Sequence, residues 1–137
     1  FAFVNNYKAF VHRVDEFLDS YVESVQSNFD KDAFQQEFQR MLDFVDKYFE
    51  YGFRKTKNAK STPRVRFEAI AVGVGLALRE KPDLIPASMD WLGSDDFKAH
   101  TTTHASNSPA RVSGRIEYVR DALLAGSKAG DENASNE

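Results

Sequence analysis

Cysteine is absent from this chain of 137 residues. Without a thiol, the sequence excludes disulfide scaffolds, zinc-finger and zinc-ribbon sites, iron–sulfur clusters and cysteine nucleophiles. Long apolar runs are lacking too, since the longest one, residues 69–78, is about half of the ~20 residues that a membrane-spanning helix needs. We therefore expect a chain with no membrane-spanning segment and no thiol-based chemistry.

A large net charge of either sign is also missing. The chain has 18 basic and 21 acidic side chains and a net charge of −3, which excludes a globally basic nucleic-acid binder but leaves room for a local basic patch. A hydrophobic fraction of 42% and an aromatic fraction of 13% provide enough material for one core. The chain begins with Phe1 and shows no signal-peptide pattern, so we expect a cytoplasmic fragment of a longer protein.

Helical periodicity dominates the first half of the chain. Apolar residues recur at steps of three and four over residues 5–27, which predicts one amphipathic helix. Asp30 is the expected N-cap of a second helix, which Gly52 should end, and the short link predicts an antiparallel hairpin of the two. The expected inward residues of the second helix are Phe34, Phe38, Met41, Leu42, Val45, Tyr48 and Phe49.

The third helix, predicted for residues 63–80 with Ser61 or Thr62 as its cap, is apolar nearly all round. An apolar circumference implies burial on several sides, so we expect this helix to be central. Gly73 and Gly75 lie inside it, and each costs about 1 kcal/mol against alanine in a helix. Close approach of another helix across the small residues is the expected compensation.

The second half of the chain predicts two more helices. Ser94 should cap a short helix over residues 95–100, and Ser108 should cap the last one, with Pro109 at its first position and Gly126 at its end. No strand pattern of period two is present. We expect an all-α fold, a single compact bundle of about five helices over residues 1–126, followed by a disordered tail over residues 127–137.

One run of basic residues is the main candidate site. No acidic residue lies between Tyr51 and Phe67, so the local charge is +6. Such segregation suits contacts with phosphate groups, because each cation can displace a condensed counterion. A solvated loop whose charges offset Glu50 and Glu68 is the alternative interpretation. The candidate anion or nucleic-acid contacts are Arg54, Lys55, Lys57, Lys60, Arg64 and Arg66.

Catalytic and metal-binding patterns are weak. His100 and His104 are spaced as a helical metal pair would be, but three threonines lie between them and no acid takes the general-base position of an H-E-x-x-H motif. The paired carboxylates lie on polar helix faces. We therefore expect no catalytic residue, no metal site and no cofactor in this fragment.

Three segments carry a family resemblance: MLDFVDKYFEYGF at 41–53, PRVRFEAIAVGVGLALR at 63–79 and TTTHASNSPARVSGRIEYVRDALL at 101–124. Together they resemble the C-terminal helical region of the GmrSD-type bacterial proteins, over residues 29–124. Those relatives carry an N-terminal ParB/sulfiredoxin-like domain with a D-G-Q-Q-R motif, and some add an HNH nuclease domain. The relatives tend to have an Asp at the position of His104, which argues further against a metal pair.

The resemblance implies nucleotide-dependent defence against phage DNA by the parent protein. No D-G-Q-Q-R motif occurs in this chain, so no catalytic residue carries over. We expect a non-catalytic helical module of a DNA-targeting, restriction-like protein that supports or senses for a catalytic part outside this chain. Its partners would be the rest of the parent protein and DNA at the basic loop. The alternative is a helical protein–protein interaction or homo-oligomerisation domain without a nucleic-acid role.

Overall fold

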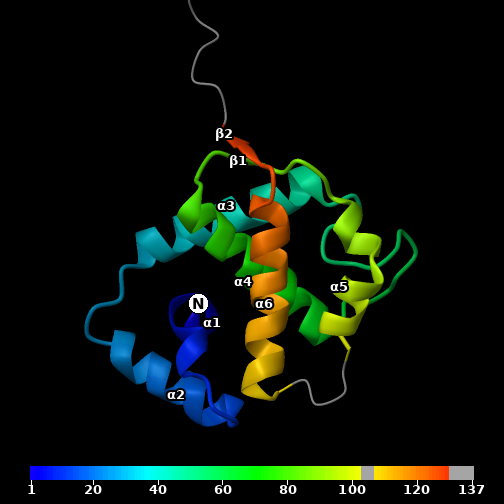
Figure 1. The fold of residues 1–137 in the computed structure, drawn as a ribbon. Coiled ribbons are helices and arrows are strands. Elements are labelled where there is room, and N and C mark those ends of the chain that lie inside the picture. Colours follow the sequence, from blue (N-terminus) through cyan, green and yellow to red (C-terminus); the bar gives the residue numbers. More distant parts are fainter. Residues whose placement is uncertain (103–106, 130–137) are drawn as a thin grey trace, which may run out of the picture.

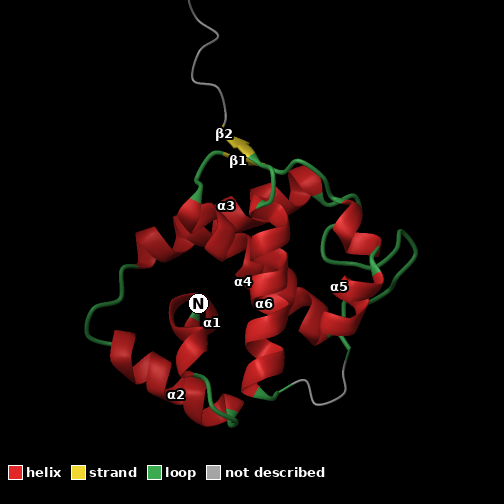
Figure 2. Ribbon diagram, viewed as in Figure 1, coloured by secondary structure: helices red, strands yellow, loops and turns green. Residues whose placement is uncertain are grey.

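The structure, a computed structural model, describes residues 1–102 and 107–129 and confirms the all-α class. Within these residues lie six α-helices, two short 3₁₀ helices and one pair of two-residue strands (Figures 1 and 2). In chain order they are α1 (Ala2–Asn6), η1 (Tyr7–Ala9), α2 (Val14–Val25), α3 (Lys31–Tyr48), α4 (Arg64–Glu80), β1 (Leu84–Ile85), η2 (Asp90–Gly93), α5 (Asp95–His100), α6 (Pro109–Leu124) and β2 (Lys128–Ala129).

Helix α4 is the centre of the molecule, as its apolar circumference predicts. It packs against α6, α3 and α1, and eleven of its residues are buried. Figure 1 shows α6 running across α4. A Cβ built on Gly73 would lie 2.5 Å from the Cβ of Val119 on α6, and one built on Gly75 would lie 3.4 Å from Val4 of α1. The two glycines therefore face different neighbours, and only Gly73 lies where a side chain cannot fit.

The single helix predicted over residues 5–27 is wrong. The chain breaks after η1, because Phe10 is extended, and α2 starts anew at Val14. The Phe10 ring packs edge-on against Phe3 at 5.6 Å and Phe17 at 5.5 Å. The break lets Tyr7 and Phe10 reach the core while α2 folds back along α1, so tertiary packing overrides a continuous periodicity.

Helix α3 begins and ends close to the prediction but has a different partner. The Asp30 carboxylate accepts a hydrogen bond from the Ala33 amide, as an N-cap does. The helix ends at Tyr48, and Gly52 adopts its positive φ of 58° in the following turn rather than at the helix end. The predicted hairpin with α2 is wrong, since α3 packs chiefly on α4.

The inward face of α3 is only partly the predicted one. Met41, Val45 and the following Phe49 are buried as expected, and Phe44 is buried although it was not among the predicted residues. Phe38 is exposed instead of inward. The N-terminal half of α3 therefore extends beyond the core.

The N-caps of the later helices are those predicted from the sequence, except the N-cap of α4. Neither Ser61 nor Thr62 caps α4, whose N-cap is Pro63 without a side-chain bond. The Ser108 hydroxyl accepts from the Arg111 amide at the start of α6. Helix α6 ends at Leu124, and Gly126 follows with a φ of 63°.

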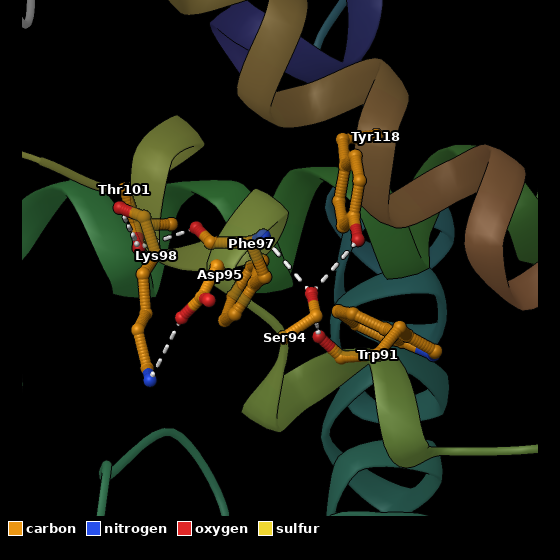
Figure 3. A network of polar contacts seen from close by, with 7 residues as sticks. All are labelled: Trp91, Ser94, Asp95, Phe97, Lys98, Thr101 and Tyr118. Carbon is orange, nitrogen blue, oxygen red and sulfur yellow. Dashed lines mark hydrogen bonds and ion pairs between the residues drawn. The ribbon is translucent and has the colours of Figure 1, made fainter.

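Helix α5 is held by the polar network of Figure 3. The Ser94 hydroxyl accepts from the Phe97 amide, donates to the Trp91 carbonyl and lies 3.1 Å from the Tyr118 hydroxyl of α6. At the other end, the Thr101 hydroxyl donates to the Phe97 carbonyl. These bonds fix α5 against α6, with the buried Phe97 ring between them and α4.

The prediction of a disordered tail from residue 127 onward is wrong for residues 127–129. Strand β2 pairs antiparallel with β1, Leu84 opposite Ala129, and the Lys81 ammonium donates to the carbonyl of Ser127. This pair of two-residue strands leaves the fold all-α, and residues 130–137 lie outside the described part. No helix in the described residues is long and apolar enough to cross a membrane.

Candidate functional site

The basic loop, which we define as residues 54–60, carries four exposed cations: Arg54, Lys55, Lys57 and Lys60. It contains no acidic residue, and none of the four cations forms an ion pair with any residue that the structure describes. The Arg54 guanidinium donates to the Lys57 carbonyl, which closes the turn on itself. The result is a localised positive surface of four charges.

Arg66 does not belong to that surface, so its prediction as a phosphate contact is wrong. Its side chain is buried, with 7% of the residue exposed. The guanidinium donates to the carbonyls of Phe53 and Arg54 at 2.9 and 3.2 Å, and it lies 5.1 Å from the centre of the Phe97 ring. Burial lowers the pKa of Arg66, but an arginine stays charged at physiological pH. Arg66 therefore anchors the start of the basic loop to α4 and α5.

Arg64 lies at the edge of the candidate surface. Its guanidinium donates to the Asn107 side chain at 3.0 Å and forms an ion pair with Glu68 at 3.5 Å, while more than half of the side chain stays exposed. Arg64 and Arg66 are two residues apart on the helix, so their side chains point about 200° apart and meet different neighbours. Arg64 is thus partly committed to contacts within the chain.

A buried ion pair lies next to Arg64 and was not predicted from the sequence. The Arg115 guanidinium of α6 donates through Nε and Nη2 to Oε1 of Glu68 on α4, at 2.9 and 2.6 Å. Arg115 is 1% exposed and Glu68 8%. Such a pair is costly to form and costly to break, since removal of one partner leaves a buried charge. It fixes the register of α4 against α6.

The signal for these buried ions was in the helical spacing. Arg66 precedes Ile70 and Gly73 at steps of four and seven, so it shares the apolar face of α4. Arg115 is three residues after Val112 and four before Val119, which places it on the inward face of α6. An arginine on an inward face needs a carboxylate or carbonyl partner, and the sequence could have indicated this.

His100 is part of no recognisable metal site among the residues that the structure describes. His100 lies against the Tyr118 ring, with ring centres 4.7 Å apart, and Gly114 leaves room for it. His104 lies outside the described residues. Within residues 1–102 and 107–129, no group of three or more histidine, aspartate or glutamate side chains is placed to hold a metal ion.

A second surface feature is an apolar groove of about 370 Å³ on the face of α4 that α6 leaves open. Its walls include Leu18 of α2, Phe38 of α3 and Phe67 of α4, and Ala71 and Gly75 of α4 line it as well. Glu37, Arg64 and Glu68 are the charged residues that line it. The groove does not overlap the basic loop.

Comparison with models of protein families, with curated proteins and with solved structures finds no match to this chain. The function has to be inferred from these two surfaces and from the residues that build them.

Proposed function

We propose that this chain is a non-catalytic helical module that contacts the phosphate backbone of DNA through the basic loop. The observation that carries the proposal is the cluster of Arg54, Lys55, Lys57 and Lys60, exposed and without an ion-pair partner among the described residues. Surface cations of a soluble domain usually mix with carboxylates. This loop has none, although the chain as a whole is acidic.

The anchoring of the loop supports the same function. Because Arg66 holds the carbonyls of Phe53 and Arg54, the first part of the loop is ordered before any ligand arrives. Ordering a loop in advance lowers the entropy lost on binding. Four cations on one short loop suit a sequence-independent contact, because phosphate contacts position a protein on DNA and base contacts read the sequence.

The role within a longer protein follows from the resemblance to the GmrSD-type region. We propose that the module supports or senses for a nucleotide-dependent, DNA-targeting part located elsewhere in its parent protein. A D-G-Q-Q-R motif upstream of Phe1 in the coding sequence is the expected finding. A full-length gene with an unrelated neighbouring domain would contradict this parentage and leave the DNA contact to be tested alone.

The DNA contact is tested by salt titrations of binding to a short duplex. The test variant changes Lys55, Lys57 and Lys60 to Gln, and the matched control changes three exposed lysines elsewhere, Lys8, Lys31 and Lys47, to Gln. Both variants remove three charges. For each phosphate that the test variant no longer neutralises, we expect the slope of log K against log salt to shrink by about 0.9, and the control to show a smaller change.

Three results would contradict the proposed contact. They are absence of binding by the parent chain at low salt, equal slopes for the parent and the test variant, and equal losses of affinity in the two variants. The last would mean that net charge alone governs binding. Circular dichroism of each variant establishes that it is folded before its affinity is compared.

A further inference from the structure

Helix α2 is amphipathic, and only part of its apolar face is packed against the rest of the chain. It is the one α-helix in the described residues without a buried side chain. One row of its apolar face, represented by Phe17, packs on Phe3 and Phe10. The next row, Leu18 and Val22, stays 41% and 51% exposed. An apolar row left open on an amphipathic helix marks a surface that something else covers.

The apolar groove lies beside this row, because Leu18 is one of its wall residues. Phe38 and Phe67 on its walls are 45% and 43% exposed, which is unusual for rings of their size next to a core. Ala71 and Gly75, one turn apart on α4, are the small residues of the groove, and Val4 of α1 covers Gly75. Leu18 belongs both to the exposed row and to the wall of the groove, so the row and the groove adjoin each other.

The charges around this face are complementary to each other. Helix α2 has four acidic residues and no basic one. Asp15 and Asp19 each precede a member of the exposed row by three positions, so they border it. Arg64 lines the groove with a half-exposed guanidinium, whereas the two carboxylates of the lining, Glu37 and Glu68, pair with Arg79 and Arg115. An acidic helix edge and an exposed cation in the groove of the same molecule suit a self-complementary contact.

We propose that the groove and helix α2 form the interface of a two-fold homodimer. The exposed Leu18–Val22 row of each copy lies against Phe38 and Phe67 of the other, and the acidic edge of α2 faces Arg64 of the second copy. A two-fold axis uses the same patch twice, so one contact covers both the exposed row of α2 and the groove. The basic loop stays outside this interface, so dimerisation leaves it accessible to DNA.

The oligomeric state of the 137-residue chain tests the proposal, by sedimentation equilibrium over a wide range of concentration. We expect a reversible dimer that Phe67→Lys and Leu18→Lys each weaken at least tenfold. Ile85→Lys is the matched control, because Ile85 is equally exposed at 46% but lies on β1, away from the groove. Circular dichroism separates loss of association from loss of folding, and Leu18→Gln provides a milder change if a lysine unfolds the chain.

Cross-linking then tests the geometry of the dimer. Because the chain has no cysteine, only the introduced thiols react. A Leu18→Cys chain is mixed with a tagged Phe67→Cys chain and treated with a short bifunctional maleimide. We expect a cross-linked species of mixed mass, and far less of it when Ile85→Cys replaces Phe67→Cys.

A monomer at every concentration, a dimer that the groove variants leave intact, or equal cross-linking of the Ile85→Cys chain would each overturn the proposal. A monomer whose groove binds an unrelated helix or an apolar small molecule would overturn it as well, and would assign the groove to another occupant.

Discussion

Helix α6 and the N-terminal arm (α1, η1 and α2) pack against the same central helix, α4, in opposite ways. Against α6, α4 approaches so closely that Gly73 has no room for a methyl group, and Glu68 pairs with Arg115 out of reach of water. Against the arm, α4 offers Gly75, where a methyl group would make an ordinary contact with Val4. The arm is tied further by Tyr7, whose hydroxyl donates to Glu117 of α6.

This difference separates the part of the molecule that stabilises the fold from the part that is free to contact a partner. The α4–α6 pair combines apolar packing with a buried ion pair, so we expect it to supply most of the free energy of unfolding. The arm buries few side chains and leaves an apolar row open, so it is the region free to meet a partner. Three sets of substitutions and one exchange measurement test this contrast.

The largest effect is expected inside the pair. Glu68→Leu removes the carboxylate that Arg115 holds at 2.6 Å and should lower the free energy of unfolding by about 3–5 kcal/mol. Urea denaturation measures it, with Glu80→Leu as the control, since Glu80 lies at the exposed end of the same helix. The double variant Glu68→Leu/Arg115→Met should recover part of the loss. A Glu68→Leu chain as stable as the parent would mean that the buried pair does not hold α4 on α6.

The two glycines of α4 give the sharpest version of the comparison. Gly73→Ala places a methyl group 2.5 Å from the Val119 Cβ, and the overpacking should cost about 1–3 kcal/mol. Gly75→Ala faces the arm at 3.4 Å and should be neutral or stabilising by up to about 1 kcal/mol, through helix propensity. The same denaturation experiment compares both. Equal costs at the two positions would remove the distinction between a tight and a loose interface.

The smallest effect is expected at the tie between the arm and α6. Burial raises the pKa of Tyr7 above its ordinary value of 10.0, and its bond to the Glu117 carboxylate raises it further. The phenol therefore stabilises the fold fully below about pH 10, and this contribution is lost as the pH rises through the raised pKa. Tyr7→Phe should cost about 1 kcal/mol at neutral pH. Its deficit relative to the parent should shrink above about pH 10, and a deficit independent of pH would contradict this role.

Local signals in the sequence predicted the parts of the fold that local chemistry decides. Asp30, Ser94 and Ser108 each accept the amide three residues on, as their position before a helix implies. The internal glycines of α4 predicted a close helix contact, which is found at Gly73. Each of these features depends on a few neighbouring residues, so no tertiary information was needed.

Features set by tertiary contacts were harder to predict. The spacing from Phe10 to Val14 and Phe17 is the same in a continuous helix and in one that breaks at Phe10, so periodicity alone could not find the break. The strand pair at Leu84 and Ala129 is too short to leave a pattern. In the candidate site, Arg54, Lys55, Lys57 and Lys60 are exposed, and their contact with phosphate stays a prediction. The burial of Arg66 was missed because the run was interpreted by its charge alone, although the spacing to Ile70 and Gly73 places Arg66 on the apolar face of α4.

Native-state hydrogen exchange tests the contrast between the pair and the arm most directly. It is measured at a concentration below the proposed dimerisation, so that α2 is not covered by a second copy. We predict that the amides of α4 and α6 exchange only through global unfolding, while those of α2 exchange through local opening at clearly lower free energy. Equal protection of α2 and α4 would contradict the account, because it would make the arm part of the same cooperative core.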